Sequence, residues 1–259
     1  MLTAGIDAGS RTIKVVLLES RRMEVLATGL CDQGLRQDEL ATALLERVLA
    51  DAGVPRRRVS RCVATGYARG QVSQADATLT EITCHACGVR RFLPQARTVI
   101  DIGGQDSKVI RLDAHGAVQD FVMNDRCAAG TGRFLELVAA RLATDVEELG
   151  RMASAGMAPA AISSMCAVFA ETEIIGLLAG GSPPADISAG VQQAVARRVA
   201  AMAGGRVHPP VAFTGGVALV AGMAGAMERA LGCPVSVARD PQMTGALGAA
   251  ILAIPRAGR

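Results

Sequence analysis

Lysine is almost absent from this chain, which carries its positive charge as arginine. Lys14 and Lys108 are the only lysines among 27 basic residues. The 24 acidic residues are mixed with them along the chain, and the net charge is +3. We therefore expect no basic surface of the kind that binds DNA or RNA. The two lysines are therefore candidates for a specific structural or functional role.

Aromatic residues and long apolar runs are also scarce. Aromatics make up 2% of the chain, with no Trp and one Tyr, so surfaces that stack nucleic-acid bases are not expected. The uncharged stretch over residues 211–227 holds Thr214 and four glycines and is short for a membrane span. The N-terminal "MLTAGIDAGS" resembles no export signal. We therefore expect a cytoplasmic protein without a membrane partner, whose seven cysteines are reduced.

The periodicity of apolar residues indicates a mixed α/β fold. Strands are expected near residues 3–7, 13–19, 24–30, 61–65, 97–102, 107–112, 117–122, 210–214 and 234–237. Helices are expected near residues 37–51, 78–89, 131–142, 145–154, 166–179, 185–203, 218–231 and 242–253. The loop "GGSPPAD" ends at Asp186, which is expected to cap the following helix.

Both lysines occur in the same short pattern. "DAGSRTIK" (7–14) and "DIGGQDSK" (101–108) each read Asp-x-Gly, with Lys seven positions after the Asp. Apolar residues flank both segments, which predicts a strand, a tight glycine turn and a second strand. We interpret the pair as a duplicated phosphate-binding hairpin, with two unrelated hairpins as the alternative.

The two turns predict a nucleotide site, because backbone N–H groups and hydroxyls of such turns bind phosphate oxygens. Asp7 and Asp101 are candidates to hold Mg²⁺ through water, and Asp101 or Gln105 to orient the attacking water. The segment "FTGGVAL" (213–219) ends a strand in two glycines, which lets the backbone approach a nucleoside. Glu136 is a candidate for the ribose or an exposed helix charge. The further candidate nucleotide-binding residues are Gly9, Ser10, Arg11, Thr12, Lys14, Gly103, Gly104, Lys108, Gly130, Thr131, Gly132, Gly215, Gly216 and Val217.

These segments resemble the actin, Hsp70 and sugar-kinase superfamily of ATPases, from Asp7 to "GALGAAIL" at Gly245. The resemblance implies an α/β fold of two ribonuclease-H-like domains around an ATP cleft. The first would comprise residues 1–95 with the C-terminal helix 241–259. The second, residues 96–240, would carry the cysteines discussed next.

Two isolated cysteines stand in similar surroundings, Cys127 in "NDRCAAGTGRFLE" and Cys166 in "SSMCAVFAETE". Both are expected at helix N-termini, where a thiolate is favoured. A [4Fe–4S] cluster takes four thiolates, which two copies of the chain would supply. The alternative is a pair of small buried thiols. Cys84 and Cys87 form a C-x-x-C unit that is interpreted as buried thiols or as an accessory redox pair.

Together with "DIGGQDSK" and "FTGGV", the two cysteine segments resemble the activators of 2-hydroxyacyl-CoA dehydratases, relatives of benzoyl-CoA reductase ATPase subunits. The resemblance covers residues 4–252. It implies a homodimer in which Cys127 and Cys166 of both subunits hold one [4Fe–4S] cluster. It further implies that ATP hydrolysis drives an electron from a ferredoxin or flavodoxin into a partner iron–sulfur dehydratase or reductase.

One departure and two alternatives qualify this interpretation. Leu219-Val220 stands where the family pattern leads us to expect Lys-Asn, so only the backbone glycines of that segment are carried over. A small-molecule kinase of the same superfamily would use the phosphate turns and leave the two cysteines without a task. A nucleotide-switched assembly or chaperone module of the actin type would contain no iron.

Overall fold

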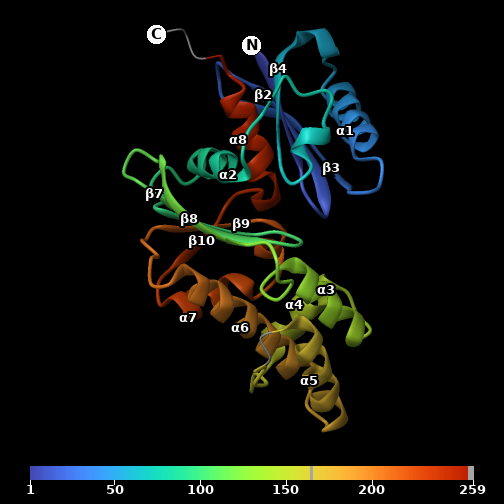
Figure 1. Cartoon of the computed structure of the whole chain (residues 1–259), viewed down its shortest axis with the longest axis vertical. Helices are drawn as coiled ribbons and strands as arrows, with labels where there is room; N and C mark the ends of the chain where they lie inside the picture. Colours follow the sequence, from blue (N-terminus) through green and yellow to red (C-terminus); the bar gives the residue numbers. More distant parts are fainter. Residues whose placement is uncertain (164–165, 256–259) are drawn as a thin grey trace. The chain divides into compact units, whose positions relative to one another are not determined.

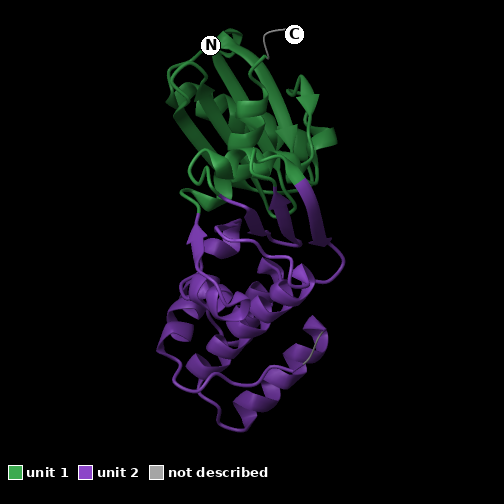
Figure 2. Cartoon of the chain, turned by 90° about the vertical axis from the view of Figure 1, so that its left-hand side faces the viewer, with its two compact units in different colours: residues 1–95, 113–118, 238–259 green, residues 96–112, 119–237 purple. Residues whose placement is uncertain are grey.

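The computed structural model describes residues 1–163 and 166–255, and the chain forms two compact units (Figure 2). Unit 1 comprises Met1–Gln95, Asp113–Val118 and Ala238–Arg259, and unit 2 comprises Ala96–Leu112 and Gln119–Val237. Residues 113–118, the tip of one hairpin, therefore belong to unit 1. The domain boundaries expected from the sequence placed these residues in the second domain. Those boundaries remain a prediction about functional domains.

Unit 1 is built on a five-stranded sheet with the order β3-β2-β1-β4-β5. β1 is antiparallel to β2 and parallel to β4. The strands are β1 (Leu2–Ala8), β2 (Thr12–Glu19), β3 (Glu24–Asp32), β4 (Val59–Thr65) and β5 (Ala77–Thr78). The helices are α1 (Gln37–Asp51), α2 (Glu81–Arg90) and α8 (Thr244–Leu252), with 3-10 turns at Arg56–Arg58, Arg69–Gln71 and Pro241–Met243.

Helices cover both faces of this sheet (Figure 1). Leu44 and Val48 of α1 pack into one core cluster with Leu17 of β2. Ala246 of α8 packs with Val16 of β2 in another cluster. Alternate residues of one strand thus face different helices, as the two-residue period of a strand requires.

The helix α8 lies in backbone contact with both β1 and α2. A Cβ on Gly5 would lie 1.9 Å from the Ala246 carbonyl oxygen, and one on Gly248 would lie 1.8 Å from the Cys84 carbonyl oxygen. No side chain fits at such distances, so glycine is required on both sides of α8. This close packing fixes α2 and α8 beside the end of β1.

Unit 2 repeats the sheet of unit 1. Its strand order, β10-β9-β6-β7-β8, is that of unit 1 when it is read from β8. β6 is antiparallel to β7 and parallel to β9, as β1 is to β2 and β4. The strands are β6 (Thr98–Ile102), β7 (Ser107–Leu112), β8 (Val118–Asn124), β9 (Val211–Thr214) and β10 (Val235–Val237). The duplication predicted for the hairpins therefore extends to both sheets, and the expected α/β class is confirmed.

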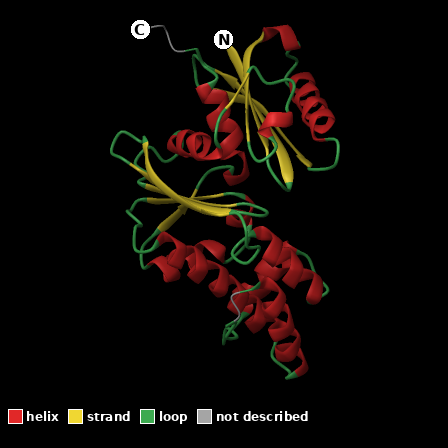
Figure 3. Ribbon diagram, viewed as in Figure 1, coloured by secondary structure: helices red, strands yellow, loops and turns green. Residues whose placement is uncertain are grey.

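The helices of unit 2 form its main core with the sheet (Figure 3). They are α3 (Gly132–Arg141), α4 (Val146–Ala155), α5 (Ala167–Ala179), α6 (Pro184–Ala203) and α7 (Met223–Leu231), with a 3-10 turn at Gly216–Leu219. Phe134 of α3, Val195 of α6 and Phe213 of β9 are almost fully buried in this core. The core joins the helices that follow the candidate cluster cysteines to the central strands.

Three local expectations differ from the structure. The two-residue strand β5 was not expected, because it is too short to show a period. The helix expected over residues 218–231 is divided into a 3-10 turn and α7, with Gly222 at φ +85° between them. Asp186 is not the cap of α6, whose N-cap is Pro183. Its carboxylate instead accepts hydrogen bonds from the backbone N–H groups of Met157 and Ala158.

Over the described parts of the chain, no helix combines the length and apolar character needed to cross a membrane.

Candidate functional site

The first Asp-x-Gly turn of unit 1 is closed by an ion pair. Asp7 and Lys14 face each other across the β1–β2 ladder. The Lys14 Nζ lies 3.2 Å from the Asp7 Oδ2, and both side chains are largely buried. The Gly9 N–H donates to the Thr12 carbonyl oxygen at 3.1 Å. The ion pair thus fixes the Asp7 carboxylate at the end of β1, and the turn presents its other backbone groups at the same place.

The second turn, in unit 2, has the same construction. Asp101 and Lys108 face each other across the β6–β7 ladder, with the Lys108 Nζ 3.3 Å from the Asp101 Oδ2. The Gly103 N–H donates to the Asp106 carbonyl oxygen at 2.9 Å. Lys108 also contacts the Asp106 carboxylate, and its side chain is only 2% exposed. The two lysines of the chain therefore have the same structural role, since each one closes a turn as the ion-pair partner of a strand-end aspartate.

Sequence analysis missed a second element beside the first turn. Asp7 lies in register with Thr65 at the end of the parallel strand β4. Gly66 follows with φ +96°. A Cβ on Gly66 would lie 2.6 Å from the Asp7 Oδ1 and 2.5 Å from the Ala8 carbonyl oxygen. Only glycine allows this approach, so Thr65-Gly66 belongs to the surroundings of Asp7.

The predicted residues of "FTGGVAL" occupy the matching place in unit 2. Asp101 lies in register with Thr214 at the end of the parallel strand β9. Gly215 follows with φ +88°, and a Cβ there would lie 2.8 Å from the Asp101 Oδ1. The sequence signal was present in both units, since "VATG" and "AFTG" each end a strand in Thr-Gly.

The start of α3 is hydrogen-bonded to the second turn. The Gly132 N–H donates to the Gly103 carbonyl oxygen at 2.9 Å, and the Arg133 N–H donates to the Gly104 carbonyl oxygen at 2.8 Å. A Cβ on Gly132 would lie 3.5 Å from the Val217 side chain. Four predicted nucleotide-binding residues are thus brought together within unit 2.

The other predicted nucleotide-binding residues have mostly local partners. Arg11 forms an exposed ion pair with Asp32 at 2.9 Å. Glu136 pairs with Arg133 at 3.0 Å, and Gln105 is exposed in the second turn. Roles in binding nucleotide or water remain predictions for all three. The remaining predicted residues are Ser10 and Thr12 at the first turn, Gly130 and Thr131 directly before α3, and Gly216 at the start of the 3-10 turn that follows β9.

His85, on α2, is a buried residue near Asp7 that the sequence did not reveal. Its Nδ1 lies 3.0 Å from the Thr244 hydroxyl of α8. A Cβ on Gly245 would lie 3.1 Å from the His85 Nε2 and 3.2 Å from the Asp7 Oδ2. Because Gly245 has no side chain, the His85 imidazole and the Asp7 carboxylate can approach each other beside it.

Cys127 and Cys166 are the exposed cysteines among those the structure describes. Cys166 is the N-cap residue of α5, as expected. Cys127 is not at a helix N-terminus, because α3 begins only at Gly132, and that expectation was wrong. Asn124 holds the Cys127 backbone instead, donating from Nδ2 to its carbonyl oxygen at 2.8 Å and accepting its N–H at 3.2 Å.

The two exposed cysteines share a charged neighbour. Burial lowers the pKa of the Arg198 guanidinium, while Coulomb interactions with Cys127 and Cys166 raise it. Two thiols far apart in the sequence are thus within electrostatic reach of one side chain of α6. Exposed thiols are suitable ligands for a soft metal or an iron–sulfur cluster. A set of three or more His, Cys, Asp or Glu residues that could hold a metal ion is not found in the described part of a single chain.

The buried cysteines differ chemically from this pair. Burial raises the pKa of the Cys62 and Cys84 thiols to about 12. Burial also raises the pKa of Cys31. These thiols remain protonated near neutral pH, which favours a packing role for them. Cys87 is only half-buried.

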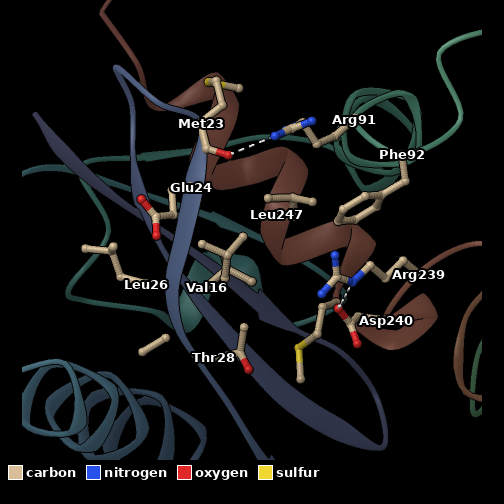
Figure 4. Close-up of a pocket in the computed structure, with 13 residues that line it drawn as sticks. Val16, Met23, Glu24, Leu26, Thr28, Arg91, Phe92, Arg239, Asp240 and Leu247 are labelled. Carbon is tan, nitrogen blue, oxygen red and sulfur yellow. Dashed lines mark hydrogen bonds and ion pairs between the residues drawn. The ribbon is translucent and has the colours of Figure 1, made fainter.

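A separate pocket of about 490 Å³ lies on unit 1 (Figure 4). Its apolar lining includes Val16 and Leu247. At its rim, Arg91 donates to the Met23 carbonyl oxygen at 3.2 Å. The lining holds two arginines and two carboxylates, so the pocket lacks the excess positive charge that a phosphate site needs. Its other lining residues are Glu24, Val25, Leu26, Ala27, Thr28, Phe92, Arg239, Asp240 and Met243.

Residues 4–253 match the BadF/BadG/BcrA/BcrD ATPase family. The chain belongs to this family. It is 43% identical to the activator of lactoyl-CoA dehydratase from Anaerotignum propionicum, over 98% of this chain and 97% of that protein. The family resemblance inferred from the sequence segments is therefore confirmed.

Two solved structures have the same fold over nearly the whole chain. The activator of 2-hydroxyisocaproyl-CoA dehydratase from Clostridium difficile, with bound ADPNP, matches with a TM-score of 0.93 and 40% identity, covering 98% of this chain and 94% of that one. Component A of the (R)-2-hydroxyglutaryl-CoA dehydratase of Acidaminococcus fermentans matches with a TM-score of 0.93 and 39% identity, covering 98% and 97%.

Proposed function

We propose that this chain is an ATP-dependent activator that transfers an electron to a partner 2-hydroxyacyl-CoA dehydratase or a related reductase. The observation that carries the proposal is a short covalent connection in unit 2. Cys127 is followed five residues later by Gly132, whose N–H is bonded to Gly103 of the second phosphate turn. A group that binds the turn and a group that binds the cysteine are therefore coupled through one peptide segment.

ATP is the ligand proposed for the two turns, and membership of an ATPase family supports this proposal. Lys14 and Lys108 neutralise strand-end carboxylates in the free protein, and the turns offer backbone N–H groups to phosphate oxygens. In this proposal Asp7 and Asp101 hold Mg²⁺ through water, and the ion offsets the phosphate charge. Gln105 is proposed to orient the attacking water.

A single [4Fe–4S] cluster shared by two copies is proposed for the exposed cysteines. Such a cluster takes four thiolates, and Cys127 with Cys166 offers two exposed thiols per chain. When bound, the cluster supplies one-electron redox chemistry. The chain itself orients the thiols, through Asn124 at Cys127 and through the N-terminus of α5 at Cys166.

In this proposal, the coupling between the ATP turn and the cluster must supply the free energy for electron transfer. A tenfold change in a one-electron equilibrium corresponds to about 59 mV, or about 1.4 kcal/mol. Transfer to an acceptor a few hundred millivolts lower therefore needs several kcal/mol. A change in the second turn on ATP binding or hydrolysis would pass through Gly132 to the Cys127 segment.

The proposed partners follow from this chemistry. The acceptor is an iron–sulfur dehydratase or reductase, and the donor is a small ferredoxin or flavodoxin. The acyl-CoA is bound by the partner enzyme rather than by this chain. The cytoplasm is the location proposed for this reaction, because thiols stay reduced there.

Iron analysis of anaerobically purified protein tests the proposal. We expect about two irons per chain, because four irons of one cluster are shared by two chains, together with a dimer in solution. Cys127→Ser should lose iron and dimer together, whereas Cys233→Ser, which changes a half-buried cysteine, should keep both. An iron-free wild-type protein that also resists reconstitution would contradict the electron-transfer proposal.

A further inference from the structure

His85 is held in place by backbone contacts between α2 and α8, which lie side by side (Figure 1). A Cβ on Gly248 of α8 would lie 1.8 Å from the Cys84 carbonyl oxygen. A Cβ on Gly88 of α2 would lie 1.9 Å from the Thr244 carbonyl oxygen. These contacts lie before and after His85 along α2, and His85 is almost fully buried. Because close packing holds side chains in defined rotamers, the imidazole is presented in one fixed position.

Two hydrogen bonds determine which nitrogen of the His85 ring carries the proton. The Thr244 hydroxyl donates to the Pro241 carbonyl oxygen at 3.2 Å. The His85 Nδ1 lies 3.0 Å from the same hydroxyl oxygen. Since a hydroxyl has one proton to donate, its oxygen accepts the second hydrogen bond, from the Nδ1–H. The neutral ring then offers its Nε2 as a hydrogen-bond acceptor.

The Nε2 atom lies beside the Asp7 carboxylate. A Cβ on Gly245 would lie 3.1 Å from the His85 Nε2 and 3.2 Å from the Asp7 Oδ2. Two atoms this close to one point are within the combined reach of two hydrogen bonds of up to about 3.2 Å each. A carboxylate oxygen and an unprotonated ring nitrogen are both acceptors. A water molecule, which has two protons to donate, is therefore suited to bind both.

The surroundings of Asp7 fit a hydrated cation. The Lys14 Nζ lies 3.2 Å from the Asp7 Oδ2, and three glycines also lie beside this carboxylate. A Cβ on Gly66 would lie 2.6 Å from the Oδ1, and one on Gly9 would lie 3.8 Å from it. Together with Gly245, these glycines keep bulky side chains away from the carboxylate. The space suits Mg²⁺, which keeps several of its waters and binds to proteins through few carboxylates.

We propose that His85 is a positioning residue of the nucleotide site, whose Nε2 accepts a hydrogen bond from a water of the Mg²⁺ shell that Asp7 binds. The proposal rests on the proposed function, in which Asp7 holds Mg²⁺ through water, and it adds a residue to that site. Thr244 acts through His85, because its hydroxyl fixes the proton on Nδ1. Groups that orient the ligands of a metal contribute about tenfold to hundredfold to its affinity.

Two substitutions of His85 separate the roles of its two nitrogens. The side chain of asparagine is shorter than that of glutamine by one methylene group. His85→Asn therefore keeps a donor near the Nδ1 position for Thr244 and loses the acceptor at the Nε2 position. His85→Gln places its amide oxygen near the Nε2 position and keeps that acceptor. His115→Asn, which removes an imidazole from an exposed turn, is the control.

The readout is the magnesium factor, defined as the ratio of ADPNP affinity in saturating Mg²⁺ to ADPNP affinity in EDTA. Calorimetry on the full-length protein measures both affinities. His85→Asn should lower the magnesium factor about tenfold and leave the affinity in EDTA unchanged, whereas a merely structural role would lower both affinities. His85→Gln and His115→Asn should keep most of the factor. An unchanged factor in His85→Asn, or a loss in His85→Gln as large as that in His85→Asn, would overturn the proposal.

Thr244 provides a second test if His85→Asn does not fold. Thr244→Val removes the oxygen that holds Nδ1, and Thr244→Ser keeps it. The magnesium factor should fall in Thr244→Val and stay in Thr244→Ser, and equal factors would overturn the proposal.

Failure of this proposal and failure of the proposed function give different results. A wild-type protein whose ADPNP affinity does not depend on Mg²⁺ would refute the magnesium role of Asp7 and this proposal with it. A normal magnesium factor in the wild type and in all variants would refute the role of His85 alone. Neither readout depends on iron, so the electron-transfer proposal is decided separately by iron analysis.

Discussion

The carboxylate of Asp7 occupies the space that a side chain on Gly66 would need, with its Oδ1 2.6 Å from the Cβ position. Gly66 also has φ +96°, which L-residues rarely adopt. Replacing Gly66 by Ala should therefore displace Asp7 or the backbone of β1. We expect loss of at least tenfold in ATP hydrolysis together with weaker Mg²⁺-ATP binding, measured by steady-state kinetics and calorimetry.

Gly53→Ala is the matched control for this substitution. Gly53 has φ +63° and no atom within 4 Å of its Cβ position, so alanine there introduces backbone strain of about 1 kcal/mol and no clash. Its ATP hydrolysis should remain near that of the wild type. Equal losses in the two variants would show that general destabilisation, rather than the Asp7 contact, is responsible.

Lys108 gives a prediction about stability that differs between the two turns. Lys108→Met would leave the buried carboxylate of Asp101 and the half-buried carboxylate of Asp106 without their cation, and removal of one partner of a buried pair destabilises by about 3–5 kcal/mol. Lys14→Met should destabilise less, because Lys14 is 14% exposed against 2% for Lys108. Urea unfolding followed by circular dichroism measures both. A smaller effect for Lys108 than for Lys14 would contradict this interpretation.

The cysteines should react in a definite order. In iron-free protein at pH 8, iodoacetamide should label the exposed Cys127 and Cys166 first. Cys62 and Cys84, with pKa values of about 12, hold about one thiolate in ten thousand at that pH. They should be labelled only as pH rises toward 12 or as the chain unfolds. Mass spectrometry of time-resolved samples gives the order, and early labelling of Cys62 would contradict it.

Much of the fold could be predicted from the sequence because its signals are local. Apolar runs flanked by glycine turns gave most of the strands, and the scarcity of lysine pointed directly to the Asp7 and Asp101 turns. The same pattern predicted the repeat of the two hairpins.

What could not be predicted depends on contacts between distant segments. His85 is hydrogen-bonded to Thr244, 159 positions away, and nothing in the segment "TCHACGV" predicts that contact. Arg198 is one of 25 arginines, and only the placement of α6 beside the Cys127 turn distinguishes it. Cys127 was expected at a helix N-terminus, but it lies in the segment before Gly130, which adopts φ +92°, and α3 begins at Gly132.

The backbone contact between α2 and α8 gives the last prediction. A Cβ on Gly248 would lie 1.8 Å from the Cys84 carbonyl oxygen, and neither helix can avoid it by moving a flexible side chain. Gly248→Ala should therefore separate the helices, destabilise the protein by about 1–3 kcal/mol or more, and impair ATP hydrolysis through His85 and Asp7. Gly176→Ala in α5 is the control, since nothing lies within 4 Å of its Cβ position. It should stabilise by about 0.5–1 kcal/mol through helix propensity. Thermal unfolding of both variants decides the matter, because equal shifts in Tm would mean that α2 and α8 are not in the contact described.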